Sequence, residues 1–249
     1  MSAAISPRAL FEAPRHFVGW VTPSANTVVE RVTLGILRHF PEVSPHFSRT
    51  SVVGAVDPFP LTYDFDDMLA TARVLGDARL DVVAWNGSKG GSLDFRLDHE
   101  LVARIEAVTG AASTTSTLAI DTVFREDGIT RFALACPYVD SYRDRIVRSF
   151  AKEGYGCTAA LNAGLSDNYS FSQIPLDTIA AMLRELAASK PQAIVCFCTN
   201  FPAAPIVAEL EEELGVPIYD TVTMGVWGAL RLLGIDTRAA RDWGQVFGR

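Results

Sequence analysis

Long hydrophobic runs and clusters of basic residues are both missing from this sequence of 249 residues. No apolar stretch approaches the roughly 20 residues of a membrane-spanning helix, and the first 17 residues contain no hydrophobic segment of the kind found in secretion signals. The formal net charge is −7, which argues against nucleic acid or an anionic membrane surface as a main partner. We therefore expect a cytoplasmic protein with a loosely held N-terminal arm, no nucleic-acid partner and no membrane partner.

Cysteines are few and carry no ligand pattern. The four are Cys136, Cys157, Cys196 and Cys198, and they form neither a CxxC pair nor a set with histidines. In the cytoplasm such cysteines stay reduced, so we expect no disulfide, and the spacing predicts no metal site.

What is present is the composition of an ordinary soluble enzyme. Hydrophobic residues make up 49% of the chain and charged residues 20%. A chain of this length suits one large α/β domain or two domains of about 120 residues.

Short apolar runs alternate with stretches of helical periodicity along the whole chain. We expect strands at residues 17–21, 47–53 and 80–85 in the first part and at 131–135, 156–163, 192–197 and 216–219 in the second. Helices of 10–15 residues between such strands are typical of βαβ units and parallel sheets.

The order of elements repeats within the chain. The strand at 132–135 lies 114 residues after the strand at 18–21, and residues 192–198 match residues 81–87 at an offset of 111. The repeat predicts two α/β lobes related by a pseudo-two-fold axis, with an active site in the cleft between them. We assign residues 17–130 plus 216–249 to the N-terminal lobe and 131–215 to the second. The alternative is that βαβ folds repeat such patterns in any case.

Residues 193–202 contain the most informative motif. A buried strand runs into Phe197 and Cys198, so the thiol is expected at the carboxyl end of the strand, where ligands bind in open α/β sheets. A helix at 203–214 would then place its N-terminus near this thiol and lower its pKa. We expect apolar Phe197 and Phe201 to oppose that effect and leave the pKa near the working pH. The competing interpretation is that Cys198 is a small buried hydrophobic residue.

The repeat pairs Cys198 with Gly87. A symmetric pair of thiols is therefore absent, and we expect Gly87 to leave space for a substrate group on the face opposite Cys198.

These motifs together resemble the Asp/Glu racemase superfamily, in its maleate isomerase and arylmalonate decarboxylase branch. The resemblance covers roughly residues 17–235, and it implies two Rossmann-like lobes and chemistry without a cofactor on carbon acids next to carboxylates. It is carried by Thr22-Pro23-Ser24-Ala25-Asn26-Thr27, Asp81-Val82-Val83 with the loop that follows, Pro137-Tyr138, Ser166-Asp167-Asn168, and Cys198-Thr199-Asn200-Phe201-Pro202 leading to Leu214-Gly215-Val216-Pro217.

The resemblance is divided between the two activities. Racemases of the superfamily use two cysteines, maleate isomerases use the first of two as a nucleophile, and arylmalonate decarboxylase has a glycine and then one cysteine. This sequence follows the decarboxylase at Gly87 and Cys198. It follows the isomerase at Asn26 and Asn168, where the isomerase binds substrate carboxylate.

The expected site is a set of donors around one thiol. Loss of CO₂ or of a proton beside a carboxylate leaves an enediolate, which preorganised donors stabilise. We expect Cys198 to act as the acid that protonates it. The candidate donors and carboxylate ligands are Asn26, Ser88, Lys89, Tyr138, Asn168 and the backbone N–H groups of Thr199 and Asn200. As alternatives, Asn26 caps a helix and Lys89 is a solvated surface lysine.

The sequence thus favours a decarboxylase of a substituted malonate-like acid. A maleate cis–trans isomerase or an Asp/Glu-type racemase is the second hypothesis, and a cytosolic binding protein for small acids is the third. The partner is a small carboxylic acid in each case. The loop at residues 57–67 is expected to fold over the site, and whether the chain forms a homo-oligomer is left open.

Overall fold

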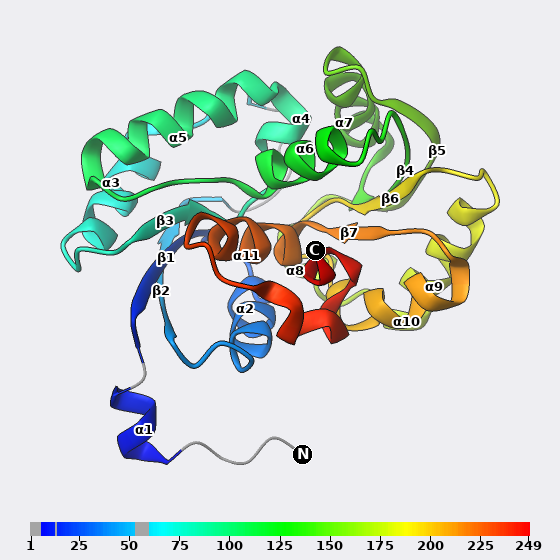
Figure 1. Cartoon of the computed structure of the whole chain (residues 1–249). Coiled ribbons are helices and arrows are strands. Elements are labelled where there is room, and N and C mark those ends of the chain that lie inside the picture. The colour runs from blue at the N-terminus through cyan, green and yellow to red at the C-terminus, as the bar shows by residue number, and fades with distance from the viewer. Residues whose placement is uncertain (1–5, 13, 53–59) are drawn as a thin grey trace.

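Two parallel sheets organise the chain in the computed structural model, which describes residues 6–12, 14–52 and 60–249 (Figure 1). The first sheet has the order β2-β1-β3, and the second has the order β5-β4-β6-β7. All pairings between these strands are parallel. The strands are β1 (His16–Pro23), β2 (Val43–Thr50), β3 (Val82–Trp85), β4 (Arg131–Tyr138), β5 (Gly156–Leu165), β6 (Ala193–Cys196) and β7 (Ile218–Asp220).

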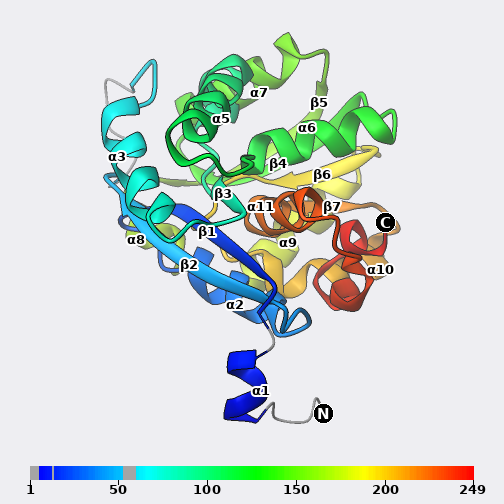
Figure 2. The same ribbon diagram turned by 60° about the vertical axis from the view of Figure 1, so that its left-hand side comes forward.

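Helices cover the faces of both sheets. Those before β4 are α1 (Pro7–Glu12), α2 (Val29–Leu37), α3 (Phe65–Gly76), α4 (Gly90–Leu93), α5 (Phe95–Thr109) and α6 (Ser116–Glu126). Those after it are α7 (Asp140–Lys152), α8 (Asn168–Phe171), α9 (Leu176–Ala187), α10 (Val207–Leu214) and α11 (Thr221–Leu232), with 3-10 turns at Ala204–Ile206, Thr237–Trp243 and Gln245–Gly248. Helix α1 stands away from the body of the molecule (Figures 1 and 2).

The two halves have matching topology, which confirms the predicted two-lobe α/β fold. Strands β1 and β4 occupy the same place in their sheets, each paired with the next strand on one side and with β3 or β6 on the other. Bridges from Val82 to Ala112 and from Trp85 to Thr115 extend the first sheet as β7 extends the second. All four residues of β3 and of β6 are buried, as expected for strands covered on both faces.

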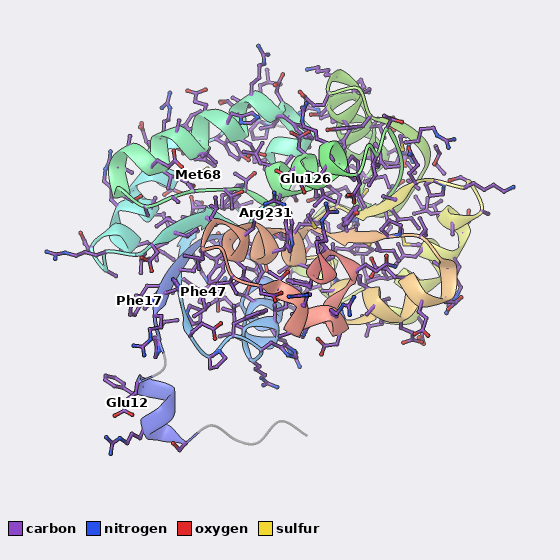
Figure 3. The ribbon with its side chains drawn as sticks, viewed as in Figure 1. Glu12, Phe17, Phe47, Met68, Glu126 and Arg231 are labelled. Carbon is purple, nitrogen blue, oxygen red and sulfur yellow. The ribbon has the colours of Figure 1, made fainter. Side chains whose placement is uncertain are left out.

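Helix α6 follows residues 112–115, and α11 follows β7. Each of these two helices packs against the other lobe. Phe124 of α6 packs its ring against Phe132 and Tyr155 of the second lobe, at centroid distances of 6.0 and 5.0 Å. Helix α11 packs in return against α2 and β3 of the first lobe, and α6 and α11 pack against each other. The exposed Glu126 and Arg231 join these two helices by an ion pair (Figure 3).

The structure corrects several expected boundaries. Strand β7 pairs with β6, so residues 218–220 belong to the second sheet and not to the N-terminal lobe, whereas α11 does pack on that lobe. Short helices α4 and α8 replace loops predicted near residues 86–92 and 166–169. The N-terminal arm contains α1.

The loop predicted at residues 57–67 lies partly outside the described residues, and α3 begins within it at Phe65. Within the described part of the chain, no helix has the length and apolar character needed to cross a membrane.

Candidate active site

A pocket lies where the carboxyl ends of strands from both sheets meet. Its cavity volume is about 60 Å³, which suits a small ligand. The first lobe and the residues next to it contribute Pro23, Asn26, Val52, Pro60, Trp85, Ser88 and Lys89. The second lobe contributes Tyr138, Tyr142, Asn168, Phe171, Cys198 and Thr199.

Cys198 lies in this pocket two residues beyond β6, as the motif predicts. It is 3% exposed. Its sulfur accepts a hydrogen bond from the Asn200 N–H at 3.3 Å, and its own N–H donates to Thr221 Oγ1 at 3.3 Å. The neighbouring backbone is held by α11 as well as by its own loop, which fixes the direction of the thiol.

Burial raises the pKa of the Cys198 thiol to about 12, although hydrogen bonds from Tyr138 and from backbone N–H groups oppose the change. The expected pKa near the working pH is therefore wrong. The reason is that α10 begins only at Val207, nine residues beyond the thiol, so desolvation is not offset by a helix N-terminus. At neutral pH the side chain is a protonated thiol.

Tyr138 extends the pocket wall with two other aromatic residues. Its ring stacks on Tyr142 with centroids 4.0 Å apart and meets Phe171 edge-on at 5.1 Å. The Tyr138 hydroxyl is hydrogen-bonded to Cys198. Burial raises the pKa of Tyr138 well above its ordinary value, so it remains a neutral donor.

Asn26 lines the pocket and also holds the start of α2. Its Oδ1 accepts hydrogen bonds from the Val28 and Val29 N–H groups, each at 2.8 Å, and so caps α2. Its Nδ2 points the other way and donates to Thr199 Oγ1 at 3.1 Å. Capping fixes the amide so that its nitrogen, with two N–H bonds, lies at the pocket.

Asn168 and Asn200, both in the second lobe, have different roles. Asn168 lines the pocket at the start of α8. Asn200 does not line it, because its amide is used within the protein. Asn200 Oδ1 accepts from the Thr27 N–H at 2.9 Å, and its Nδ2 donates to the Asn168 carbonyl oxygen. The Asn200 side chain joins the two lobes, and only its backbone N–H reaches the thiol.

Ser88 and Lys89 line the pocket from the loop after β3. Burial lowers the pKa of Lys89, and the charge of Asp64 partly opposes this. Its Nζ lies 6.0 Å from the centre of the Tyr63 ring. Lys89 is therefore a half-buried cation at the site rather than a solvated one, which favours an anionic ligand.

Gly87 does not leave open space, which corrects the expectation from the sequence. A Cβ added to Gly87 would lie 2.1 Å from Cζ2 of Trp85 and 2.4 Å from its Cε2. The indole of Trp85 thus covers the position equivalent to Cys198 and itself lines the pocket. Sequence reasoning missed Trp85, although a large residue at the end of a central strand beside glycine was the available signal.

Tyr142 and Phe171 are further pocket residues that sequence reasoning missed. Tyr142 follows Tyr138 by four residues, and the Ser92 hydroxyl donates to its Oη at 3.0 Å. Among the described residues, no three His, Cys, Asp or Glu side chains lie close enough to hold a metal ion.

Comparison with known proteins gives one consistent group. A family model described as arylmalonate decarboxylase matches residues 60–247. The chain is 24% identical over 242 residues to arylmalonate decarboxylase of Bordetella bronchiseptica, covering 95% of this chain and 98% of that one. It is 25% identical over 226 residues to maleate isomerase of Nocardia farcinica, covering 88% and 90%.

Solved structures of the same two kinds share the fold. A variant of the maleate isomerase Iso from Pseudomonas putida S16 with maleate has a TM-score of 0.83 at 20% identity, covering 93% of this chain and 97% of that one. Unliganded arylmalonate decarboxylase has a TM-score of 0.78 at 23% identity, covering 94% and 99%.

Proposed function

This chain belongs to the arylmalonate decarboxylase family, and we propose that it is a cofactor-independent decarboxylase of a substituted malonate-like acid. Its relatives carry the names of a decarboxylase and of isomerases, so family membership alone leaves the reaction between the two. The proposal therefore depends on the chemistry of the thiol.

The observation that carries it is a single buried, hydrogen-bonded thiol in the pocket. A nucleophilic cysteine needs a thiolate and hence a lowered pKa, whereas burial raises the pKa of Cys198 to about 12. A neutral thiol that already accepts a hydrogen bond from the Asn200 N–H is suited to donate its proton and to have the resulting thiolate stabilised.

The reaction then runs in two steps, after which the thiol recovers its proton. The bond between the α-carbon and one carboxylate breaks, CO₂ leaves, and the electron pair remains on the other carboxylate as an enediolate. The Cys198 S–H bond breaks next, its proton joins the α-carbon, and the thiolate recovers a proton from water. Tyr138 and the Asn200 N–H stabilise the transient thiolate.

The remaining polar residues bind the acid. Asn26 and Ser88 supply neutral donors from the first lobe, and Thr199 and Asn168 supply them from the second. Lys89 adds a positive charge at the same pocket. A dianionic substrate is matched by these groups, and the retained carboxylate becomes the enediolate that they stabilise.

An isomerase on a small dicarboxylate is the second candidate, because Asn26 and Asn168 both line the pocket. That reaction, as the resemblance implies it, needs a nucleophilic thiol in the first lobe. Gly87 stands at that position and Trp85 covers it, so we favour the decarboxylase.

The test is a panel of substituted malonates, maleate and acidic amino acids in deuterated water. We expect CO₂ from malonates and a product carrying deuterium at the α-carbon in one enantiomer, because one thiol protonates one face. Cys198→Ala is expected to abolish turnover, and Cys157→Ala on β5 is the matched control.

Maleate turnover without CO₂ release would support the isomerase, and tight binding without any turnover would support a small-acid binding protein. Racemic product formed as fast as CO₂ would overturn the one-face mechanism.

A further inference from the structure

We propose that Trp85 sets the size limit of the substrate: its indole, fixed by Tyr63 and Asp98, closes the pocket beside Gly87 and limits how large an α-substituent can be. This inference rests on the proposed function and names a specificity-determining residue for it.

The first step is the position of the indole. Trp85 is the last residue of β3 and is 1% exposed, yet it lines the pocket. Its six-membered ring lies over Gly87, where an added Cβ would come within 2.7 Å of Cη2. The volume that a side chain at residue 87 would take is filled by a rigid aromatic group.

The second step is what holds the indole there. Trp85 Nε1–H donates to Tyr63 Oη at 3.2 Å, and Tyr63 O–H donates in turn to Asp98 Oδ1 at 2.6 Å. The Tyr63 ring meets the indole edge-on, with centroids 6.2 Å apart. The Trp85 N–H and the Tyr63 O–H both have an acceptor. Rotating the indole away would therefore leave the buried Trp85 N–H without its partner.

Asp98, the last acceptor in this series of hydrogen bonds, is closely packed. Asp98 is fully buried in the first turn of α5. Its carboxylate packs on the backbone of Gly90, where an added Cβ would lie 2.3 Å from both oxygens. Gly90 opens α4, directly after the pocket residues Ser88 and Lys89, so the same contact fixes the loop that binds the acid.

The third step is the size of the remaining space. The other large side chains at the pocket, Tyr138, Tyr142 and Phe171, are packed on one another and leave about 60 Å³ open to the centres of water-sized molecules. Tyr142 is further held by Ser92. Because these rings are held by one another and by Ser92, we expect the Trp85 side of the pocket to be where a smaller side chain makes room for a larger α-substituent.

The experiment compares methylmalonate with phenylmalonate in four variants. We expect Trp85→Leu to raise the ratio of kcat/KM for phenylmalonate over methylmalonate by about tenfold or more, and Trp85→Phe to raise it less. Tyr63→Phe keeps the ring but loses the hydroxyl, and we expect it to raise the ratio mainly through KM. The matched control is Trp20→Phe, because Trp20 is equally buried in the same sheet but is not part of the pocket, and it should leave the ratio unchanged.

Binding separates this proposal from the proposed function. The same two acids are titrated calorimetrically into each variant in a Cys198→Ser background, where no proton is delivered to the α-carbon. A shift in the ratio of Kd, with no CO₂ release by any variant that retains Cys198, supports the Trp85 limit and contradicts the decarboxylase. CO₂ release with an unchanged ratio in Trp85→Leu supports the decarboxylase and overturns the limit. If Trp85→Leu does not fold, Trp85→Phe decides by the same ratio, and absence of both binding and turnover overturns both proposals.

Discussion

At the scale of single residues, the chemistry of Cys198 is set by its surroundings. Iodoacetamide reacts with thiolate, and a pKa of about 12 against an ordinary value of 9.0 lowers the thiolate fraction at pH 8 by about a thousandfold. We expect labelling of Cys198 to be slower than that of a free thiol by about this factor and to rise about tenfold per pH unit towards pH 11. Mass spectrometry of the labelled peptide measures this rate. Rapid labelling at pH 7 would show that the thiol is not held protonated.

Gly87 is the second residue whose role depends on a neighbour. Adding a side chain there pushes against the Trp85 ring at 2.1 Å, and we expect Gly87→Cys to lower the free energy of unfolding by about 1–3 kcal/mol. Urea unfolding of a double-mutant cycle measures this. The loss should be smaller in a Trp85→Leu background, because the contact that causes it is gone. An equal loss in both backgrounds would contradict the assigned clash.

At the scale of elements, Asp220 connects β7 to α11. Its Oδ1 accepts from the Val222 and Thr223 N–H groups at 2.9 and 3.1 Å, and burial raises the pKa of its carboxyl from 3.8 to about 7. The folded state thus keeps a proton that the unfolded state releases between pH 4 and 7. The contribution of Asp220 to stability is therefore full below about pH 4 and is lost as pH rises through 7.

We expect Asp220→Asn to be more stable than the parent at pH 8 and to show a smaller fall in unfolding free energy between pH 4 and 7. Part of the dependence of unfolding free energy on pH should remain, because burial also raises the pKa values of Asp98 and Glu211 to about 6. Asp220→Ala also loses the cap, which costs about 0.5–2 kcal/mol at every pH. Denaturant unfolding at a series of pH values measures both. A parent slope retained in full by Asp220→Asn would contradict this assignment.

At the scale of the whole molecule, the crossed packing of α6 and α11 links the two lobes. Gly225 of α11 allows the close approach, because an added Cβ would lie 2.8 Å from Ser116 Oγ and 2.9 Å from the Asn86 amide. Helix α6 follows the first sheet and packs on the second lobe, whereas α11 follows the second sheet and packs on the first. Neither lobe is therefore expected to unfold alone.

We expect one calorimetric transition, with equal calorimetric and van't Hoff enthalpies. Gly225→Ala should lower the temperature of that single transition, since overpacking outweighs the gain in helix propensity. Gly156→Ala is the control, because its added Cβ meets only the Thr130 carbonyl oxygen, at 3.8 Å. Two separate transitions in the parent would show that the lobes unfold independently.

The sequence by itself determined the strands, the internal repeat and the place of Cys198 at the end of β6. These features are local, since a run of apolar residues and the turn after it specify a buried strand whatever lies beside it. The sequence, together with the family resemblance, also pointed to six residues that line the pocket, which are Asn26, Ser88, Lys89, Tyr138, Asn168 and Thr199. Each lies at or shortly after a strand end, and parallel strands bring those ends together.

Only the tertiary structure decided what each group meets there. Asn200 belongs to the same motif as Thr199, yet its side-chain amide is hydrogen-bonded to Thr27 and Asn168 from two other segments. Gly87 has no side chain, yet its space is filled by the indole of Trp85, which Tyr63 holds in place from another segment. The pKa of Cys198 likewise depends on how many distant side chains exclude water from it. Burial and contact are sums over segments far apart in the chain, and no local pattern contains them.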